Sequence, residues 1–313
     1  MRFTVVLCLA VIADWIFGDP RNFPHPVKLI GHAINFWHKI FFRNNESFMR
    51  GLAVVLMTLI TAGFFFGTLL YVSGCNTLME VYLLYSALAW RDLKDETAPI
   101  FFSLINHDLT GARKYLSFVV GRDTENLSEV EITRSTIETI AENSIDGVIS
   151  VMFFAGLGHA LNPQWGMIIT VWLFKAASTL DSMLGYERYG NYGKASARLD
   201  DVLNFVPARV GGLIIVLSGA FTGGNVREGF RVFMTDRLKH KSPNSAHGES
   251  AFAGVLGVRL GGGAFYGGEF VKRPFLNVSG DEPVISDIVR AWKVLDVSCG
   301  IFILMVIFLT WTL

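Results

Sequence analysis

Long apolar stretches alternate with long polar stretches along the 313-residue chain. The apolar stretches that predict membrane segments are residues 3–17, 51–74, 77–90, 148–174, 210–224 and 297–313. Residues 51–74 contain no charged side chain over a length that crosses the roughly 30 Å hydrocarbon core of a bilayer. The pattern predicts a mainly α-helical, polytopic integral membrane protein with long polar, helix-containing insertions, forming one membrane-embedded domain over residues 1–313.

Three of these segments allow more than one interpretation. Residues 3–17 contain Asp14 and lack the small-residue pattern that signal peptidase cleaves, so we expect the segment to be retained. Residues 148–174 have no Lys, Arg, Asp or Glu but are broken at Asn162-Pro163, which predicts either a hairpin of two short helices or one kinked element. Residues 210–224 are rich in Gly, and we favour a re-entrant segment because one crossing would place the many basic residues that follow outside.

Four polar insertions separate the apolar segments, at residues 19–50, 91–146, 181–209 and 227–293. The first contains more Lys and Arg than Asp and Glu, which places it in the cytoplasm by the positive-inside rule. If residues 77–90 cross back and residues 148–174 form a hairpin, the second and third insertions are cytoplasmic as well. Strand patterns are scarce and limited to Gly-rich pieces such as residues 255–268.

Composition supports the membrane assignment and excludes other classes. Hydrophobic residues make up 51% of the chain and charged residues 17%, against about 25% charged in soluble domains. The formal net charge is zero and the sequence has no basic, aromatic-interleaved patch, so we expect no nucleic-acid partner. Cys8, Cys75 and Cys299 lie in or beside apolar segments without C-x-x-C spacing, and we expect free thiols.

Residues 129–146 have the periodicity of a helix with one polar face. We interpret Glu131 and Glu138 as part of a solvated face. Glu142 and Asp146 differ because they are one helical turn apart and lead directly into an apolar segment. Carboxylates at this spacing suit Mg²⁺, which binds them together with substrate phosphates and water.

The densest polar run, residues 175–209, is flanked by apolar sequence. Its charged and amide side chains include Lys175, Asp181, Glu187, Arg188, Lys194, Arg198, Asp200, Asp201, Asn204 and Arg209. Acidic groups can hold Mg²⁺ while Lys and Arg neutralise phosphoryl oxygens, which is the division of roles that phosphoryl transfer requires. Interfacial snorkelling accounts for Lys175 and Arg209, but not for the three aspartates.

Proline-rich sequence surrounds two polar residues near the N-terminus. Three prolines between residues 20 and 26 predict rigid turns around Asp19 and His25. A capping Asp at a helix exit together with a solvated His explains this pattern as well as a functional site does. Asp14 is harder to explain in this way, because a carboxylate inside an apolar segment is costly.

The fourth insertion combines Ser242-Pro243-Asn244 with a Gly-rich stretch at residues 254–268 that includes Arg259. Small residues allow the backbone to approach a ligand closely, and successive N–H groups can bind an anion. A Gly-rich loop alone is a weak indication of such a site. The sequence has no Walker A pattern, so any nucleotide site is of another type.

Together and in this order, these segments resemble the adenosylcobinamide-phosphate synthases of cobalamin biosynthesis, the CobD/CbiB family of integral membrane proteins. The resemblance runs from end to end and is carried by Gly18-Asp19-Pro20 to Gly31, Gly121-Arg122-Asp123-Thr124, Glu142-Asn143 to Asp146-Gly147, Lys175-Ala176, Thr179 to Met183, Gly185-Tyr186, Arg198 to Asp201, and Asn204 to Arg209. A typical family stretch, SPNAGWPEAAFAG, reads SPNSAHGESAFAG here, so residues 245–248 depart from it.

The resemblance implies an ATP-dependent amide ligation. A propionate carboxylate of adenosylcobyric acid would be joined to the amine of (R)-1-amino-2-propanol O-phosphate or a related amino-alcohol phosphate. ATP would convert the carboxylate to an acyl phosphate, with Mg²⁺ and basic residues offsetting charge. The resemblance also implies a multi-pass protein of the cell inner membrane, surrounded by lipid, with its active site facing the cytoplasm and possible contact with other enzymes of the pathway.

The resemblance and the residue patterns together suggest a role for each candidate residue. For Mg²⁺ and phosphate handling we expect Glu142, Asp146, Asp181, Asp200 and Asp201. For phosphoryl, nucleotide or substrate-phosphate contacts we expect Lys175, Arg188, Arg198, Asn244 and Arg259. The catalytic set is Asp19, His25, Lys175 and Asp181, in which Asp19 or His25 would deprotonate the attacking ammonium.

Two other functions remain as alternatives. A membrane transferase acting on a lipid diphosphate also uses acidic clusters at membrane exits, but it predicts N-D-x-x-D or D-G-x-x-A-R patterns, which the residues after Gly147 do not fit. A transporter would use intramembrane charges such as Asp14, Glu80 and Lys175 along a transport path. It would also show inverted repeats, and the sequence has none.

Overall fold

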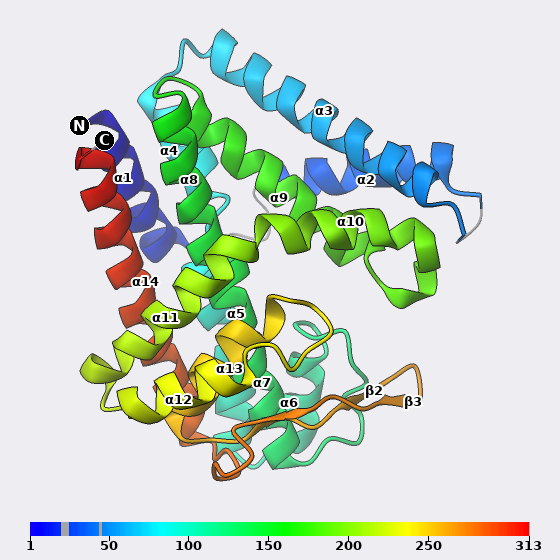
Figure 1. The fold of residues 1–313 in the computed structure, drawn as a ribbon, viewed down its shortest axis with the longest axis vertical. Helices are drawn as coiled ribbons and strands as arrows, with labels where there is room; N and C mark the ends of the chain where they lie inside the picture. The colour runs from blue at the N-terminus through cyan, green and yellow to red at the C-terminus, as the bar shows by residue number, and fades with distance from the viewer. Residues whose placement is uncertain (20–24, 44–45, 313) are drawn as a thin grey trace. The chain divides into compact units, whose positions relative to one another are not determined.

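The computed structural model describes residues 1–19, 25–43 and 46–312. The turns expected at Pro20 and Pro24 lie outside these described residues. The described chain is mainly helical and has a few short strands, which confirms the predicted fold class (Figure 1). It divides into two compact units. Unit 1 comprises Met1–Ala89, Ser150–Asn204 and Met305–Leu313, and unit 2 comprises Trp90–Ile149 and Phe205–Leu304. The single domain expected over residues 1–313 stays a prediction.

Unit 1 is entirely helical in its described part. Its elements are α1 (Arg2–Phe17), α2 (Pro26–Phe41), α3 (Phe48–Val72), α4 (Thr77–Tyr85), α8 (Ser150–Leu161), α9 (Gly166–Leu184), the short 3₁₀ helix η2 (Glu187–Tyr189), α10 (Gly190–Leu203) and the end of α14 (Ser286–Thr312). The last helix returns to the first, because the Trp311 indole N–H donates to the Thr4 hydroxyl at 2.8 Å. The two ends of the chain therefore lie side by side (Figure 1).

Unit 2 combines helices with two small antiparallel strand pairs. Its elements are α5 (Trp90–Ile105), α6 (Leu109–Leu116), α7 (Glu129–Ser144), the π-helix η1 (Ile145–Ile149), α11 (Phe205–Thr222), α12 (Val226–Asp236), α13 (Ser245–Leu256), β1 (Leu260–Gly261), β2 (Ala264–Tyr266), β3 (Glu269–Val271), β4 (Phe275–Leu276) and most of α14. Strand β1 pairs with β4, and β2 pairs with β3 in a hairpin. The strands lie within or directly after the Gly-rich stretch, where strand patterns were expected.

Five helical segments in the described chain are long enough and apolar enough to cross a membrane. They are Phe48–Val72, Glu129–Leu161, Gly166–Leu184, Phe205–Thr222 and Ser286–Thr312. These segments support the prediction of a polytopic membrane protein. All three cysteines are free, as predicted.

The expected crossing at residues 77–90 is wrong. Helix α4 has nine residues, so at 1.5 Å per residue it spans about 14 Å, roughly half of a hydrocarbon core. The apolar character of this stretch serves packing instead, because Leu83 and Leu84 are almost completely buried. Helix α1, with 16 residues and about 24 Å, is also shorter than the core. The cytoplasmic location predicted for the second insertion assumed a crossing at residues 77–90, so this argument no longer supports it.

The observed helices decide between the alternatives for residues 148–174 and 210–224. Residues 148–174 form two helices, α8 and α9, as the hairpin interpretation predicted. The helices approach closely at two glycines, because a Cβ on Gly158 would lie 2.2 Å from the carbonyl oxygen of Gly166. Residues 210–224 were favoured as re-entrant, but residues 210–222 belong to the single uninterrupted 18-residue helix α11 (Phe205–Thr222). Its length and composition are sufficient for a full crossing.

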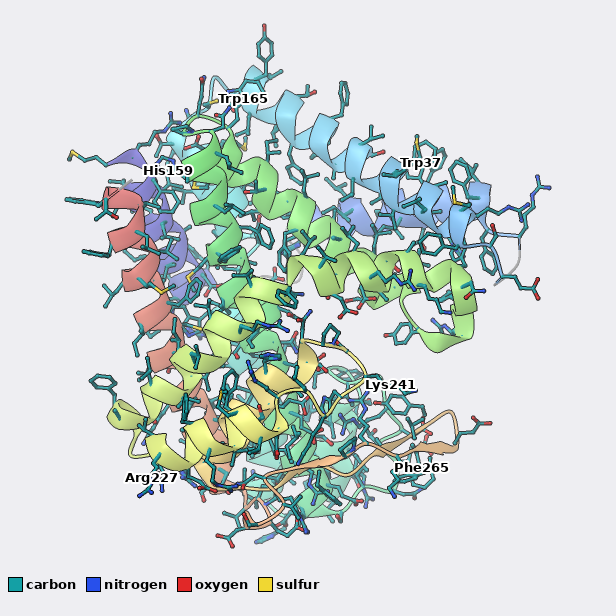
Figure 2. All side chains as sticks on the ribbon, in the orientation of Figure 1. Trp37, His159, Trp165, Arg227, Lys241 and Phe265 are labelled. Atoms are coloured by element: carbon teal, nitrogen blue, oxygen red, sulfur yellow. The ribbon has the colours of Figure 1, made fainter. Side chains whose placement is uncertain are left out.

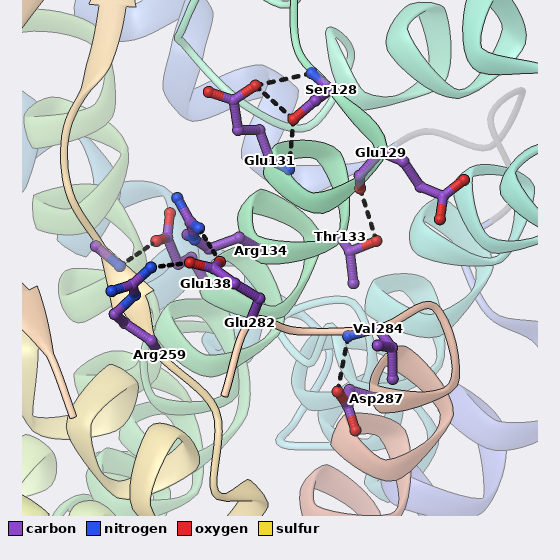
Figure 3. A network of polar contacts seen from close by, with 11 residues as sticks. Ser128, Glu129, Glu131, Thr133, Arg134, Glu138, Arg259, Glu282, Val284 and Asp287 are labelled. Atoms are coloured by element: carbon purple, nitrogen blue, oxygen red, sulfur yellow. Dashed lines mark hydrogen bonds and ion pairs between the residues drawn. The ribbon is translucent and has the colours of Figure 1, made fainter. Parts of the chain in front are cut away.

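Helix α7 is predicted correctly in its position but not in its surroundings. Ser128 and Glu131 form a reciprocal capping box that starts the helix (Figure 3). Ile132, Ile137 and Ile140 are fully buried, as their spacing predicted. The opposite face is buried as well, since Ser135 and Glu138 are 2% and 5% exposed. The expectation that Glu138 belongs to a solvated face is therefore wrong.

Candidate functional site

A small recess in unit 2 brings together charged side chains from four separate stretches of sequence. It is lined by Arg122, Glu138, Glu249, Gly261, Gly263, Ala264 and Arg273. Glu138 comes from α7 and Glu249 from α13, while Arg122 precedes α7 and Arg273 follows the β2–β3 hairpin. Burial of two carboxylates beside two guanidinium groups is costly unless they are paired or serve a reaction, which makes the recess a candidate site.

Glu138 is the most firmly held of these side chains. One carboxylate oxygen lies 2.9 Å from Nη1 of Arg122, and the other accepts the backbone N–H of Gly261 at 2.7 Å. Arg122 also donates to the hydroxyl of Ser135 at 3.1 Å. Although burial opposes the charged form, the Glu138 carboxylate raises the pKa of Arg122. Both side chains are therefore held in place by direct contacts.

At Glu249 the surroundings disfavour the charged form of the side chain. It is 3% exposed, and burial, reinforced by the neighbouring carboxylates of Glu138 and Glu142, raises its pKa well above the usual range. Arg273 and Arg122 act against this shift. Three carboxylates are thus in electrostatic contact with two guanidinium groups. One of the carboxyl groups is held toward its protonated form, as is typical of active sites.

His240 lies beside the same carboxyl group. Its Nδ1 is 3.8 Å from Oε1 of Glu249 and 3.1 Å from the hydroxyl of Ser245 at the start of α13. Burial and the charge of Arg273 lower its pKa, while Glu138 acts against them. A neutral imidazole next to a carboxyl group with a raised pKa gives this recess a proton acceptor beside a proton donor.

The Gly-rich segment forms one wall of the recess through its backbone. Gly261 has φ of 84°, and a Cβ there would lie 2.3 Å from the carbonyl oxygen of Pro274. Only glycine fits this position, which allows the N–H of Gly261 to reach Glu138. The hairpin beyond it is anchored by Asp123, whose carboxylate accepts the N–H groups of Gly267 and Gly268 at 3.0 and 2.7 Å. Figure 2 shows Phe265, which is 49% exposed, on this hairpin.

The predicted Mg²⁺ ligands Glu142 and Asp146 follow Glu138 along the same helical segment. Glu142 is exposed, and Asp146 lies in the π-helix η1, where α7 changes its hydrogen-bond register. Single π-turns inside α-helices are rare and are frequent at functional sites. The ENxxDG motif of the sequence therefore coincides with a local irregularity of the backbone.

Unit 1 contains a second group of predicted residues. His25 caps α2 by accepting the N–H of Val27 on Nδ1 at 3.3 Å, and its Nε2 lies 3.5 Å from the carboxylate of Asp19. Burial lowers the pKa of His25, the charges of Lys175 and Lys28 add to this, and Asp19 acts against it. Of the residues predicted to be catalytic, Asp19 and Lys175 therefore both lie within electrostatic reach of His25, and the imidazole is held toward its neutral form.

The polar run continues through unit 1 as far as Asn204, and its last residues, including Arg209, belong to unit 2. Asp181 lies near the end of α9, and Asp200 and Asp201 lie in α10. Asp200 accepts the amide of Asn204 at 3.0 Å, and Asn204 in turn accepts the hydroxyl of Ser150 at 2.7 Å.

The predicted phosphate-binding arginines have aromatic or acidic neighbours. The guanidinium of Arg188 lies over the rings of Tyr186 and Tyr189, and that of Arg198 lies over Phe48. In unit 2, Arg259 forms an ion pair with Glu282, which also pairs with Arg134 (Figure 3). Arg259 thus has a structural counter-ion.

The predicted metal ligands come from both units, with Glu142 and Asp146 in unit 2 and Asp181, Asp200 and Asp201 in unit 1. Across the described residues, no three His, Cys, Asp or Glu side chains converge as a metal-binding group. Mg²⁺ is often held by only one or two carboxylates together with substrate phosphates. The Glu142 and Asp146 oxygens fit that donor requirement, and the magnesium site stays a prediction.

Four residues of the recess were not among the predicted site residues: Arg122, Glu138, Glu249 and Arg273. Two of them had a signal in the sequence. Arg122 is part of the GRDT motif, and Glu249 is the glutamate that the SPN stretch shares with the typical family sequence. Glu138 was assigned to solvent because its helical spacing alone does not reveal what covers that face. Arg273 had no local signal.

Comparison with known proteins identifies the family of this chain. A family model described as CobD/Cbib protein matches residues 7–295, nearly the whole chain. The chain belongs to the CobD/CbiB family. The matched residues include helices α1 to α13, apart from the first residues of α1. They also include every charged residue of the recess.

Curated relatives agree with the family assignment. A cobalamin biosynthesis protein CobD from Clostridium perfringens is 37% identical over 301 residues, covering 93% of each chain. A protein of the same name from Desulfotalea psychrophila is 39% identical, and the alignment covers 88% of each chain. Another, from Geobacter metallireducens, is 42% identical, and the alignment covers 86% of this chain and 85% of the relative. No solved structure matches the chain. The CobD/CbiB relatives thus match over most of their own length.

Proposed function

We propose that this chain catalyses the ATP-dependent amide ligation of an amino-alcohol phosphate, such as (R)-1-amino-2-propanol O-phosphate, to a propionate carboxylate of adenosylcobyric acid. Its role in cobalamin biosynthesis follows from the family. The observation that carries the finer proposal is the recess in unit 2, where the buried Glu249 carboxyl group lies among Arg122, Arg273 and Glu138.

The reaction has two steps. A substrate carboxylate oxygen attacks the γ-phosphorus of ATP, forming an acyl phosphate and releasing ADP. The amine then attacks the acyl carbon, the C–N bond forms, and inorganic phosphate leaves with the electrons of the C–O bond. Both steps move negative charge onto phosphoryl or acyl oxygens, and guanidinium and backbone N–H groups stabilise such charge best when they are fixed in advance.

The recess supplies groups of these kinds. Arg122 is fixed by Glu138, and Arg273 lies within electrostatic reach of Glu249. A carboxyl group with a raised pKa can give a proton to a departing oxygen, and the neutral imidazole of His240 can accept one. Mg²⁺, when bound through Glu142 and Asp146, would supply further charge neutralisation at the phosphoryl group.

Unit 1 contains its own groups suited to proton transfer and phosphate binding. An ammonium must lose a proton before it attacks, and the neutral form of His25 beside Asp19 is suited to take it. Lys175 lies within electrostatic reach of the same imidazole and is suited to a phosphate contact. For the location we propose the cell inner membrane with the reacting groups on the cytoplasmic side, because the first polar insertion is rich in Lys and Arg.

The decisive assay incubates the purified protein in detergent with adenosylcobyric acid, aminopropanol phosphate, Mg²⁺ and ATP. The expected result is an amide product formed together with one ADP per turnover, and its loss when ATP or Mg²⁺ is omitted. Absence of any ATP-dependent amide product with all amino-alcohol phosphates tested would exclude the ligase.

Substitutions then test each unit separately. Glu249→Gln removes the titrating carboxyl group of unit 2 with little change of shape, and Asp181→Asn or Asp200→Asn does the same for the acidic residues of unit 1. We expect each to abolish turnover while the protein still inserts into the membrane. Glu125→Gln, on an exposed carboxylate of the second insertion, is the matched control and should retain activity.

A further inference from the structure

Several polar groups at the N-terminus of helix α13 have no role in the proposed reaction. The helix is 12 residues long, and its N-cap residue Asn244 makes no side-chain capping bond to the first turn. Instead, Oδ1 of Asn244 accepts a hydrogen bond from Arg209 at 3.2 Å. Backbone N–H groups at a helix start carry partial positive charge and favour an anion.

His247, in the first turn of α13, gives the second and independent observation. Its side chain is completely buried, and neither ring nitrogen has a hydrogen-bond partner. One face of the imidazole meets the ring of Phe233 edge-on at 5.6 Å. A buried polar group without a partner destabilises a fold, and the typical family stretch has the more apolar Trp at this position. The ring contact with Phe233 leaves both nitrogens of the imidazole unsatisfied.

Two guanidinium groups lie close to this imidazole. Arg209 from α11 and Arg237 after α12 both act electrostatically on His247 and on each other. Burial first, then these two charges, lower the pKa of His247 to about 4, while the backbone of Asn244 acts against them, so the ring is neutral and keeps one N–H donor. Nε of Arg237 is buried and also lacks a partner.

Among the described residues of unit 2, no acidic side chain forms an ion pair with either of these arginines. In the described part of unit 2, the ion pairs close to this region involve Asp236 with Lys239 and His240 with Glu249, and none includes Arg209 or Arg237. Two guanidinium groups repel each other when no anion lies between them. A bound dianion would remove the repulsion and satisfy the buried donors.

We propose that Arg209, Arg237, His247 and the first turn of α13 bind a phosphate monoester or phosphoryl group. The site is next to the recess, because His240 contacts Ser245 of the same helical turn and also Glu249. The inference deepens the proposed function and rests on it for the molecule that carries the phosphate, which is either the amino-alcohol phosphate or the nucleotide.

Binding of inorganic phosphate to the full-length protein in detergent tests the site without any assumption about turnover. Thermal unfolding is followed against phosphate concentration, with chloride replacing phosphate at equal ionic strength. The wild type should be stabilised saturably. Arg237→Gln should weaken phosphate binding at least about tenfold, because a charge-assisted hydrogen bond is lost. Arg231→Gln, an exposed arginine of α12 paired with Glu228, is the matched control and should bind as the wild type does.

His247→Phe separates a ligand-binding role from a packing role. The aromatic ring is kept and both nitrogens are removed, so the phosphate-free protein should melt at the same or a higher temperature while phosphate binding weakens. Unchanged phosphate affinity in both His247→Phe and Arg237→Gln overturns the proposal, as does the absence of saturable binding to the wild type.

Steady-state kinetics with Arg237→Gln identify the source of the phosphate. A higher KM for the amino-alcohol phosphate with an unchanged KM for ATP assigns the site to the acceptor substrate, and the reverse assigns it to the nucleotide. If the wild type forms no amide, the proposed ligase fails, whereas the phosphate titrations still decide whether the site exists.

Discussion

Glu249→Gln is the substitution that most directly tests the electrostatics of the recess. The wild-type carboxyl group is 3% exposed, and its pKa is raised by burial and by the carboxylates of Glu138 and Glu142. Glutamine has nearly the same shape and cannot ionise. The variant therefore removes the proton equilibrium and leaves the packing of α13 almost unchanged.

The expected effect on stability depends on pH, and its sign follows from linkage. The pKa of Glu249 in the folded state lies above its value of about 4.3 in the unfolded chain. Between the two values the folded state retains a proton that the unfolded state has lost, so the wild type loses stability as pH rises through this window. The loss of unfolding free energy is at most about 1.4 kcal/mol per pH unit. Each kcal/mol corresponds to ~2–4 °C of melting temperature for a unit of this size.

Thermal unfolding of the wild type and Glu249→Gln in the same detergent, from pH 4 to pH 9, measures this difference. The melting temperature of the variant should rise relative to that of the wild type as pH increases, and the gap should level off above the folded pKa. Glu125→Gln should follow the wild type at every pH. Parallel curves for the wild type and Glu249→Gln would refute a buried carboxyl group with a raised pKa.

Three further predictions concern other contacts. Arg122→Gln leaves the buried Glu138 carboxylate without its ion pair and should lower the free energy of unfolding by about 3 kcal/mol, measured by denaturant or thermal unfolding. Gly51→Ala places a Cβ 2.0 Å from a backbone carbonyl oxygen of α10 and should lower the yield of folded protein, whereas Gly300→Ala, with nothing within 4 Å, should not. Asp181→Asn should abolish amide formation without preventing membrane insertion, and unchanged activity would remove this residue from the site.

Local patterns predicted the parts of the fold that depend on neighbouring residues. The uncharged run at residues 51–74 predicted α3, and the spacing of isoleucines predicted α7, because helix periodicity and bilayer thickness act on contiguous sequence. Asn162-Pro163 predicted the break between α8 and α9. The same reasoning failed at residues 77–90, where apolar side chains are buried by protein, since hydropathy does not distinguish a lipid-facing surface from a packed one.

The candidate site was predicted in part. Motifs identified Asp19, His25 and Lys175, and the structure shows electrostatic contact among them. Motifs also contained Arg122 and Glu249 without indicating their roles. Glu138 was misassigned, because a glutamate on the polar face of a helix has the same local pattern whether water or a guanidinium lies opposite.

The sequence by itself determined that this is a helical membrane protein of the CobD/CbiB type, because hydropathy, caps and motifs are properties of short contiguous segments. Only the tertiary structure decided that residues 122, 138, 249 and 273 meet in one recess, and that His247 is buried beside two arginines. Burial and the distances between charges set the pKa values and the pairing of these groups. Both depend on contacts between separate elements, such as that between Glu138 of α7 and Gly261 of β1, so no local pattern contains them.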